Sequence, residues 1–130
     1  MKYGLSLGYR DFIIIGGIGG RLDHTYANIQ TLFYALTQGA DARILSKDSV
    51  CRMLGEGKEY NIPKKEGFYI SLFSYSEKCE GITIKGTKYC LENASLSNTF
   101  PLGVSNEFED DKAFISIEKG TVLLILSRKN

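Results

Sequence analysis

The sequence has 130 residues, 43% of them hydrophobic and 24% charged, which is typical of one ordinary globular domain or two very small ones. Sixteen basic and fifteen acidic side chains leave a formal net charge of +1, so the composition indicates neither nucleic acid nor an anionic membrane as a partner. The apolar runs are far shorter than the roughly 20 residues that cross a bilayer, and the first ten residues lack the apolar core of a signal peptide. Three cysteines without C-x-x-C spacing indicate reduced, packed thiols, and we expect a cytoplasmic protein.

The first half of the chain predicts one β-α-β unit over residues 12–46. A short apolar run at 12–15 is typical of a strand buried on both faces, and a second strand is expected at 43–45. Between them, apolar residues recur at helical spacing and Gly39 ends the helix; these residues are Leu22, Tyr26, Ile29, Phe33 and Leu36.

The opening residues, MKYGLSLGYR, are typical of the last turns of a helix that ends at Gly8. Two parallel strands with one helix do not bury both faces of a sheet, and parallel sheets are normally covered on both sides. We therefore expect the chain to be a fragment whose N-terminal α/β part lies upstream of Met1.

Beyond Ser49 no useful helical period remains, and short strand-like runs recur between turn signals. Seven strands are expected: Val50–Leu54, Lys58–Ile62, Phe68–Ser74, Ile82–Lys85, Tyr89–Glu92, Ala113–Glu118 and Val122–Ser127. This pattern predicts a small antiparallel β-sandwich or barrel over residues 50–130. Gly86-Thr87 and Lys119-Gly120 are the expected hairpin turns.

The turn between the first strand and the helix carries the sequence GGIGGRLDH. Neither the Walker pattern nor G-x-G-x-x-G fits it, because Gly20 is followed by Arg21 and Leu22. Glycine-rich strand-to-helix turns nevertheless direct backbone N–H groups and the positive end of a helix dipole at one place, and Arg21 suits phosphate oxygens. Gly17, Gly19 and Gly20 therefore indicate an anion site, although a tight turn that binds nothing fits this stretch equally well.

Asp23 has two readings. An aspartate near a helix start is a favoured N-cap, and capping alone explains it. Beside phosphates it would instead need a cation, and Mg²⁺ is usually held by one or two carboxylates plus substrate phosphates. His24 and Asn28 lie four residues apart on one helical face and could orient such a site, although a single histidine is more often an ordinary surface or core residue.

A polar stretch, GVSNEFEDDK, precedes the next-to-last expected strand. Ser105, Asn106 and Glu107 cluster in it, and an ordinary loop explains them through local backbone hydrogen bonds. The acidic run at 109–111 is interpreted as a solvated turn rather than a metal site.

Two ordered motifs resemble one known family. The string GGIGGRLDHTYANIQTL resembles the G-G-x-G-G-R-x-D-H-x-x-x-N-I signature of thiamine pyrophosphokinases. GITIKGTKYCLENASL followed by GVSNEF resembles the C-terminal β-domain of the same family, so that the resemblance runs from about Leu5 to Arg128. Because the motifs lie in separate halves of the chain, the match is far more specific than a lone glycine-rich loop.

The resemblance implies ATP-dependent, Mg²⁺-assisted pyrophosphoryl transfer to the hydroxyethyl group of thiamine, giving thiamine diphosphate and AMP. It implies a homodimer whose active site lies between an N-terminal α/β domain and a β-domain, with both protomers contributing. The fold class becomes α/β plus all-β: residues 1–49 as the remnant of a Rossmann-like, ATP-binding α/β domain and 50–130 as a thiamine-binding β-sandwich.

Residue by residue, the resemblance assigns roles to the motif positions. The glycine-rich turn with Arg21, His24 and Asn28 would face the nucleotide, and Asp23 would serve at the metal and the reacting phosphates. Ser105 and Asn106 would line the thiamine pocket.

The sequence also departs from the family. Nothing in it corresponds to the aspartates of the G-D-x-D-S type that help to hold Mg²⁺ and nucleotide, and Lys47-Asp48-Ser49 is no substitute. The chain has no tryptophan, which some relatives carry near the final strand, so the aromatic partner for thiamine is unidentified. The chain by itself is therefore expected to be inactive. Two alternatives remain: a non-catalytic small-molecule-binding or dimerisation β-module, and a degenerate Rossmann-like nucleotide-binding protein.

Overall fold

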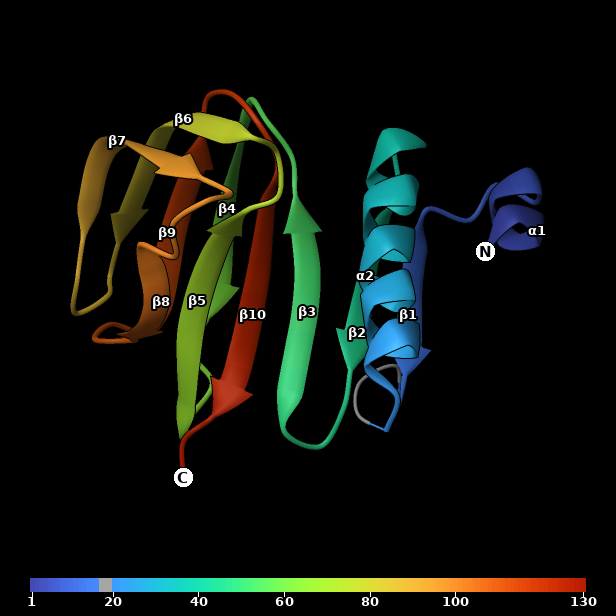
Figure 1. Cartoon of the computed structure of the whole chain (residues 1–130), viewed down its shortest axis with the longest axis horizontal. Coiled ribbons are helices and arrows are strands. Elements are labelled where there is room, and N and C mark those ends of the chain that lie inside the picture. The colour runs from blue at the N-terminus through green and yellow to red at the C-terminus, as the bar shows by residue number, and fades with distance from the viewer. Residues whose placement is uncertain (17–19) are drawn as a thin grey trace. The chain divides into compact units, whose positions relative to one another are not determined.

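The computed structural model describes residues 1–16 and 20–130. It divides the chain into two compact units, Met1–Met53 and Leu54–Asn130 (Figure 1). The described residues are mostly β, with ten strands and two helices. This agrees with the strand-rich part of the expected fold class, whereas the derivation of residues 1–49 from a Rossmann-like domain and the boundary at 49 stay predictions.

The first unit contains the expected β-α-β element. Its elements are α1 (Lys2–Ser6), β1 (Asp11–Ile15), α2 (Leu22–Thr37), β2 (Asp41–Leu45) and β3 (Ser49–Leu54). Strands β1 and β2 pair in parallel from Asp11 opposite Asp41 to Ile15 opposite Leu45, and β3 pairs antiparallel with β2. The expected helix end near Gly8 is confirmed, because α1 stops at Ser6 and Gly8 takes a φ of +94°.

The expectation that β1 is buried on both faces is wrong. Ile13 and Ile15 are 64% and 84% exposed, whereas Ala42 and Ile44 of β2 are buried on the face that α2 covers. On the other face of the parallel pair, the described residues of this unit leave Ile13 and Ile15 exposed, which is the difficulty that the sequence raised.

The buried face of α2 also differs from the expected one. Leu32 and Ala35 are its buried residues, while Leu22 and Tyr26 are 85% and 60% exposed. These two apolar residues of the first two turns therefore follow the helical period without being buried.

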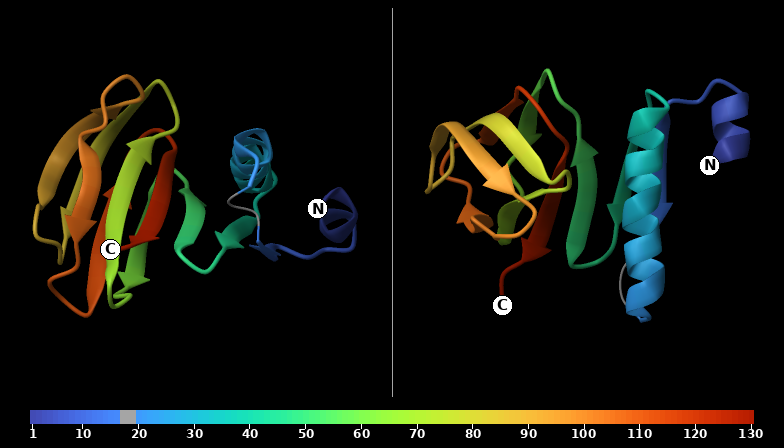
Figure 2. Two further views of the ribbon diagram at one scale, coloured as in Figure 1. Left: turned by 60° about the horizontal axis from the view of Figure 1, so that its bottom comes forward. Right: turned by 45° about the horizontal axis from the view of Figure 1, so that its top comes forward.

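The second unit is built from antiparallel strand pairs in two layers (Figure 2). One layer holds β10, β5 and β8, and the other holds β4, β9, β6 and β7, each in that order. The bounds are β4 Lys58–Pro63, β5 Phe68–Ser74, β6 Lys78–Lys85, β7 Leu91–Ser97, β8 Gly103–Glu107, β9 Lys112–Ile117 and β10 Val122–Arg128.

Three sequence-based assignments in this unit need correction. Residues 103–107 form strand β8 rather than a loop, and β7 begins at Leu91 rather than Tyr89. Lys119-Gly120 does not close a hairpin, because β9 and β10 lie in different layers. The turn at Gly86 does join two paired strands, β6 and β7; its φ is +81° and an added Cβ would lie 2.4 Å from the carbonyl oxygen of Lys112.

The core of the second unit lies between the two layers. Its fully buried side chains alternate along the inner faces of the strands, as in a β-sandwich, and include Ile70, Ile82, Ile115, Ile117, Val122 and Leu124. This alternation is what the period-two pattern of the sequence encodes.

The three cysteines are all free thiols, as expected, but only two are packed. Cys51 and Cys79 are buried and Cys90 is exposed. Burial raises the pKa of the Cys51 thiol to about 11, which makes it a poor nucleophile. Neither helix in the described part of the chain has the length and apolar character needed to cross a membrane.

Candidate functional site

The glycine-rich turn follows β1 and leads into α2. Gly17 and Gly19 lie outside the described residues, while Gly16 and Gly20 have φ values of +73° and +64°, a region that favours glycine. Helix α2 begins at Leu22 with Arg21 as its N-cap, and no side chain caps it. The interpretation of Asp23 as an N-cap is therefore wrong: Asp23 lies within the first helical turn.

Asp23 and Arg21 pair with each other at the start of α2. The Nη2 of Arg21 lies 2.5 Å from the Oδ2 of Asp23, and the other carboxylate oxygen accepts the backbone N–H of His24 at 2.9 Å. The two side chains are 70% and 61% exposed. Exposed pairs of this kind contribute about 0–1 kcal/mol, so both charges can turn to a ligand at little cost.

His24 and Asn28 follow on the same helix, one turn apart. The structure places His24 at the surface and leaves Asn28 half-buried. Asp23 and His24 thus belong to the first turn of α2, where the helix dipole favours an anion, and Asn28 lies in the next turn.

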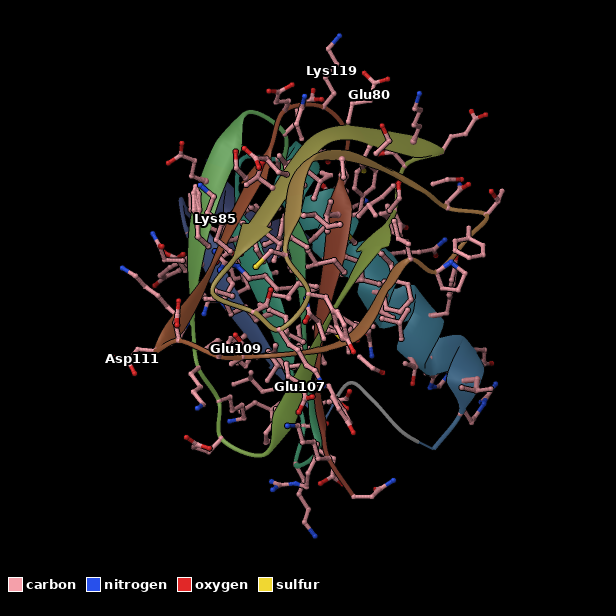
Figure 3. All side chains as sticks on the ribbon, turned by 90° about the vertical axis from the view of Figure 1, so that its left-hand side faces the viewer. Glu80, Lys85, Glu107, Glu109, Asp111 and Lys119 are labelled. Atoms are coloured by element: carbon pink, nitrogen blue, oxygen red, sulfur yellow. The ribbon has the colours of Figure 1, made fainter. Side chains whose placement is uncertain are left out.

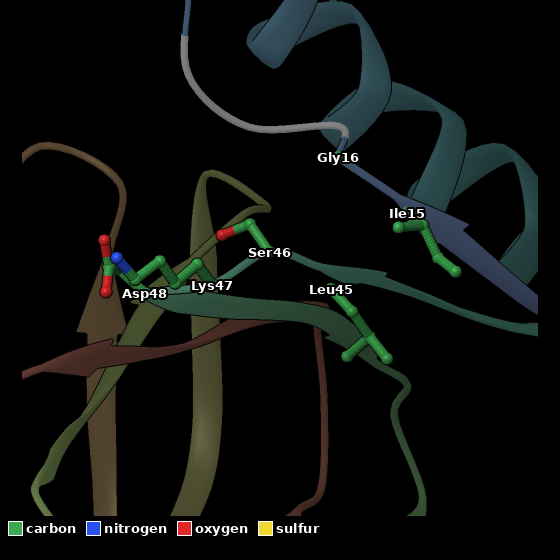
Figure 4. Close-up of a pocket in the computed structure, with 6 residues that line it drawn as sticks. All are labelled: Ile15, Gly16, Leu45, Ser46, Lys47 and Asp48. Carbon is green, nitrogen blue, oxygen red and sulfur yellow. The ribbon is translucent and has the colours of Figure 1, made fainter.

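A cavity of about 630 Å³ opens at the carboxyl ends of β1 and β2 (Figure 4). Its lining residues are Ile15, Gly16, Leu45, Ser46, Lys47 and Asp48. Ligands of open α/β sheets bind outside the carboxyl ends of the strands, so this is where such a site is expected. Lys47 and Asp48 were not expected at a site; their place just after the second parallel strand was the signal that could have found them.

Asp23 could supply one ligand to a magnesium ion. Within the described residues, no group of three or more histidine, cysteine, aspartate or glutamate side chains could hold a metal. A single accessible carboxylate suits Mg²⁺ that takes most of its ligands from phosphates and water, which is its usual mode in nucleotide sites.

A second cavity, of about 240 Å³, lies in the second unit beside β8. It is lined mainly by apolar side chains, with one amide among them: Ile84, Tyr89, Leu91, Leu102, Gly103, Val104 and Asn106. Such a cavity suits a small, largely apolar ring system that offers a few polar atoms.

Asn106 lines this cavity, whereas Ser105 is not among its lining residues. The Asn106 side chain is buried, at 8% exposure. Ser105 is exposed in a left-handed conformation, with φ at +58°, and its N–H donates to the hydroxyl of buried Ser71 at 2.9 Å. It lies where the pairing of β5 and β8 shifts register, so that β8 is an irregular strand.

Glu107, which follows Asn106, forms ion pairs with two lysines. Its carboxylate lies 2.5 Å from the Nζ of Lys129 and 3.7 Å from that of Lys88. The hydrogen bond from Lys129 and its charge, helped by Lys88, hold the pKa of Glu107 below its usual value. Figure 3 shows Glu107 together with Glu109 and Asp111 of the acidic run, whose side chains are exposed as expected of a solvated turn.

The fold and the two cavities define a mostly β protein that joins a β-α-β element to an antiparallel two-layer unit. Residues 59–122 match the family "Thiamin pyrophosphokinase, vitamin B1 binding domain". A thiamine pyrophosphokinase of Bacillus subtilis strain 168 is 36% identical over 119 residues, which cover 90% of this chain and 55% of the relative.

Solved structures agree. The crystal structure of thiamine pyrophosphokinase from Bacillus subtilis superposes with a TM-score of 0.93 at 32% identity, covering 99% of this chain and 61% of that one. The enzyme from Geobacillus thermodenitrificans gives 0.87 at 25% identity, covering 99% and 59%. The resemblance read from the sequence is thereby confirmed: residues 59–122 match the vitamin B1 binding domain, and nearly the whole chain is similar to thiamine pyrophosphokinases. The chain spans about half the length of the curated relative that it matches.

Proposed function

We propose that the second unit binds thiamine in the cavity beside β8. The observation that carries this proposal is one of location: every residue that lines this cavity falls within the part of the chain that matches the vitamin B1 binding domain. Thiamine combines flat rings with an aminopyrimidine edge, and an apolar cavity with one buried amide suits that chemistry.

The proposed nucleotide site is the end of the first unit at which β1 and β2 finish. Arg21, the glycine-rich turn, His24 and Asn28 would contact ATP, and Asp23 would hold Mg²⁺. Binding would exchange the exposed pair of Arg21 and Asp23 for one phosphate contact and one metal contact. Magnesium held there would neutralise charge on the reacting phosphates.

The reaction proposed for the protein is pyrophosphoryl transfer from ATP to the hydroxyethyl oxygen of thiamine, giving thiamine diphosphate and AMP, by a homodimer. The chain alone is expected to turn over slowly, because its sequence has no second aspartate cluster of the family type. A rate within about tenfold of the median enzyme value near 10 s⁻¹, measured with ATP, Mg²⁺ and thiamine, would contradict this expectation.

The binding proposal is tested by calorimetric titration of thiamine into the chain and into Asn106→Ala. Loss of the buried amide should weaken thiamine binding by about 1–3 kcal/mol and leave nucleotide binding unchanged. Asn98→Ala, at an exposed position after β7, is the matched control and should bind thiamine normally. Equal affinities for all three proteins would contradict the proposed site.

The same titrations separate the two alternatives. A non-catalytic β-module would bind its ligand through the second unit, and Asp23→Asn would leave its affinity for nucleotides unchanged. A degenerate nucleotide-binding protein would bind nucleotides but not thiamine. Sedimentation of the chain with and without thiamine tests the homodimer.

A further inference from the structure

The loop between β2 and β3 places two charged side chains in the lining of the cavity at the carboxyl ends of β1 and β2. Lys47 and Asp48 are both exposed there, beside Ser46. We propose that this loop binds the ribose of the nucleotide, and that the Asp48 carboxylate accepts a hydrogen bond from the ribose 2′-hydroxyl. This inference rests on the proposed nucleotide site, and it names the part of the nucleotide that the cavity recognises.

The order of elements in the first unit is that of a mononucleotide-binding unit. Strand β1 leads through a glycine-rich turn into α2, and the chain returns through the parallel strand β2 to Asp48. In such units the phosphates lie at the start of the helix, and an acidic residue further along the chain hydrogen-bonds the ribose 2′-hydroxyl. The glycine spacing here differs from G-x-G-x-x-G, but the place of Asp48 just after the second parallel strand does not depend on that spacing.

The ends of the two parallel strands are joined directly. The last residues of β1 and β2, Ile15 and Leu45, are register partners, and the N–H of Gly16 donates to the carbonyl oxygen of Leu45 at 2.9 Å. Figure 4 shows Gly16 and Asp48 on the two sides of the cavity. A ligand that meets the start of the glycine-rich turn therefore also meets the loop after β2.

The loop that carries Asp48 is closed by hydrogen bonds at its base. The backbone N–H of Ser46 donates to the carbonyl oxygen of Ser49 at 2.9 Å, and the Ser46 hydroxyl donates to the same oxygen at 3.3 Å. Strands β2 and β3 pair up to the loop, where Leu45 lies opposite Val50. The two charged residues thus lie at the tip of a short, closed loop, so that little backbone freedom is lost when a ligand binds there.

The charges of the loop suit a sugar better than a phosphate. A carboxylate only accepts hydrogen bonds, so Asp48 can bind a hydroxyl but repels a phosphate unless a cation lies between them. Lys47 beside it balances its charge, which reduces the repulsion between Asp48 and the phosphates of the same nucleotide. The cavity, at about 630 Å³, lies within the size range of small-molecule sites.

The first test titrates ATP and 2′-deoxyATP, each with Mg²⁺, into the 130-residue chain by calorimetry. The original chain should bind ATP about tenfold more tightly, as expected from one hydrogen bond to a charged group. Asp48→Ala should bind the two nucleotides within about twofold of each other. Asp111→Ala, at an exposed position of the second unit, is the matched control and should keep the original ratio. Equal binding of both nucleotides by the original chain would overturn the inference.

The ratio of the two affinities also separates ribose binding from a structural role of Asp48. Aspartate is common in turns, and a damaged loop would weaken both nucleotides by the same factor. An Asp48→Ala protein that keeps the original ratio would therefore overturn the inference. Asp48→Asn keeps the preference for turns and should retain a smaller discrimination of about threefold, because a neutral acceptor forms a weaker hydrogen bond.

The second test locates the sugar by NMR. The backbone amide signals of Arg21 to His24 should shift both with ATP and with inorganic tripolyphosphate, which has no sugar, whereas those of Lys47 and Asp48 should shift with ATP alone. Equal shifts of Lys47 and Asp48 in both titrations would show that the loop meets phosphates and would overturn the inference. Absence of any ATP binding by the original chain would contradict the proposed nucleotide site itself, whereas ATP binding without preference over 2′-deoxyATP would contradict only the ribose assignment.

Discussion

The two candidate sites differ in how firmly their side chains are held. At the start of α2, Arg21 and Asp23 are well exposed; among the described residues they pair with each other and with a neighbouring amide. Beside β8, Asn106 is buried and its hydrogen bonds fix the backbone of Tyr89. The first site offers charges that can move, and the second offers a shape that is already set.

This difference matches the chemistry proposed for each site. Phosphates and a metal ion bring strong charges of their own, so loosely held partners can reorganise around them. A small ring system brings little charge, and its recognition depends on a cavity that does not have to be ordered on binding. The glycine-rich motif, which is the easier one to recognise, therefore lies at the site whose side chains are loosely held. The less specific motif around β8 lies at the site whose side chains are fixed.

The largest effect is expected from Asp23→Asn. In a longer catalytic protein that contains this chain, loss of the carboxylate charge should lower the rate of thiamine diphosphate formation at least about a hundredfold. The Asp23 side chain is exposed, and the amide oxygen of an asparagine can still accept the N–H of His24. The free energy of unfolding should therefore change by no more than about 0.5 kcal/mol. Asp111→Asn, exposed on the loop after β8, is the control and should keep full activity.

If Asp23→Asn instead destabilised the fold and left the rate per folded molecule unchanged, Asp23 would have a structural role only. The start of α2 would then not be a site of loosely held functional charges.

The parallel pair of β1 and β2 should tolerate an added charge on one face only. Ile13→Lys adds a charge at an exposed position and should change the free energy of unfolding by about 0.5 kcal/mol or less. Ile44→Lys places the same side chain where exposure is 0%, and should cost more than about 3 kcal/mol. Chemical denaturation of both variants checks this, and similar losses would mean that the outer face of β1 is covered in solution.

The smallest effect concerns Glu107 and the fixing of the loop around Tyr89. Because Lys129 and Lys88 lower the pKa of Glu107 in the folded state, the ionised carboxylate stabilises the protein above the ordinary glutamate range and this stabilisation is lost as the pH falls through the lowered pKa. Glu107→Gln should thus be less stable than the original chain near pH 7, and the gap should close in more acid solution.

Melting temperatures of both proteins across the acid range measure this gap, with Glu109→Gln as a control for the change of charge at an exposed position. A gap that does not depend on pH would show that the ion pairs of Glu107 contribute nothing to stability.

Local sequence determined much of this protein. The period-two runs predicted most strands of the second unit, because alternate residues of a half-buried strand must be apolar. The glycine-rich turn and Gly39 predicted where α2 begins and ends, because glycine takes the positive φ that these turns need. The two motifs predicted the family, since their order and separation are specific.

Tertiary structure decided what local pattern does not encode. Strand β8 is irregular and polar, so its pairing with β5 was invisible to periodicity. Tyr89 and Asn106 are seventeen residues apart, and only the folded chain brings the amide to that backbone. The exposure of Leu22 and Ile13 likewise depends on what packs against each element. Periodicity states which face of an element is apolar; burial is a property of the neighbours that fold against it.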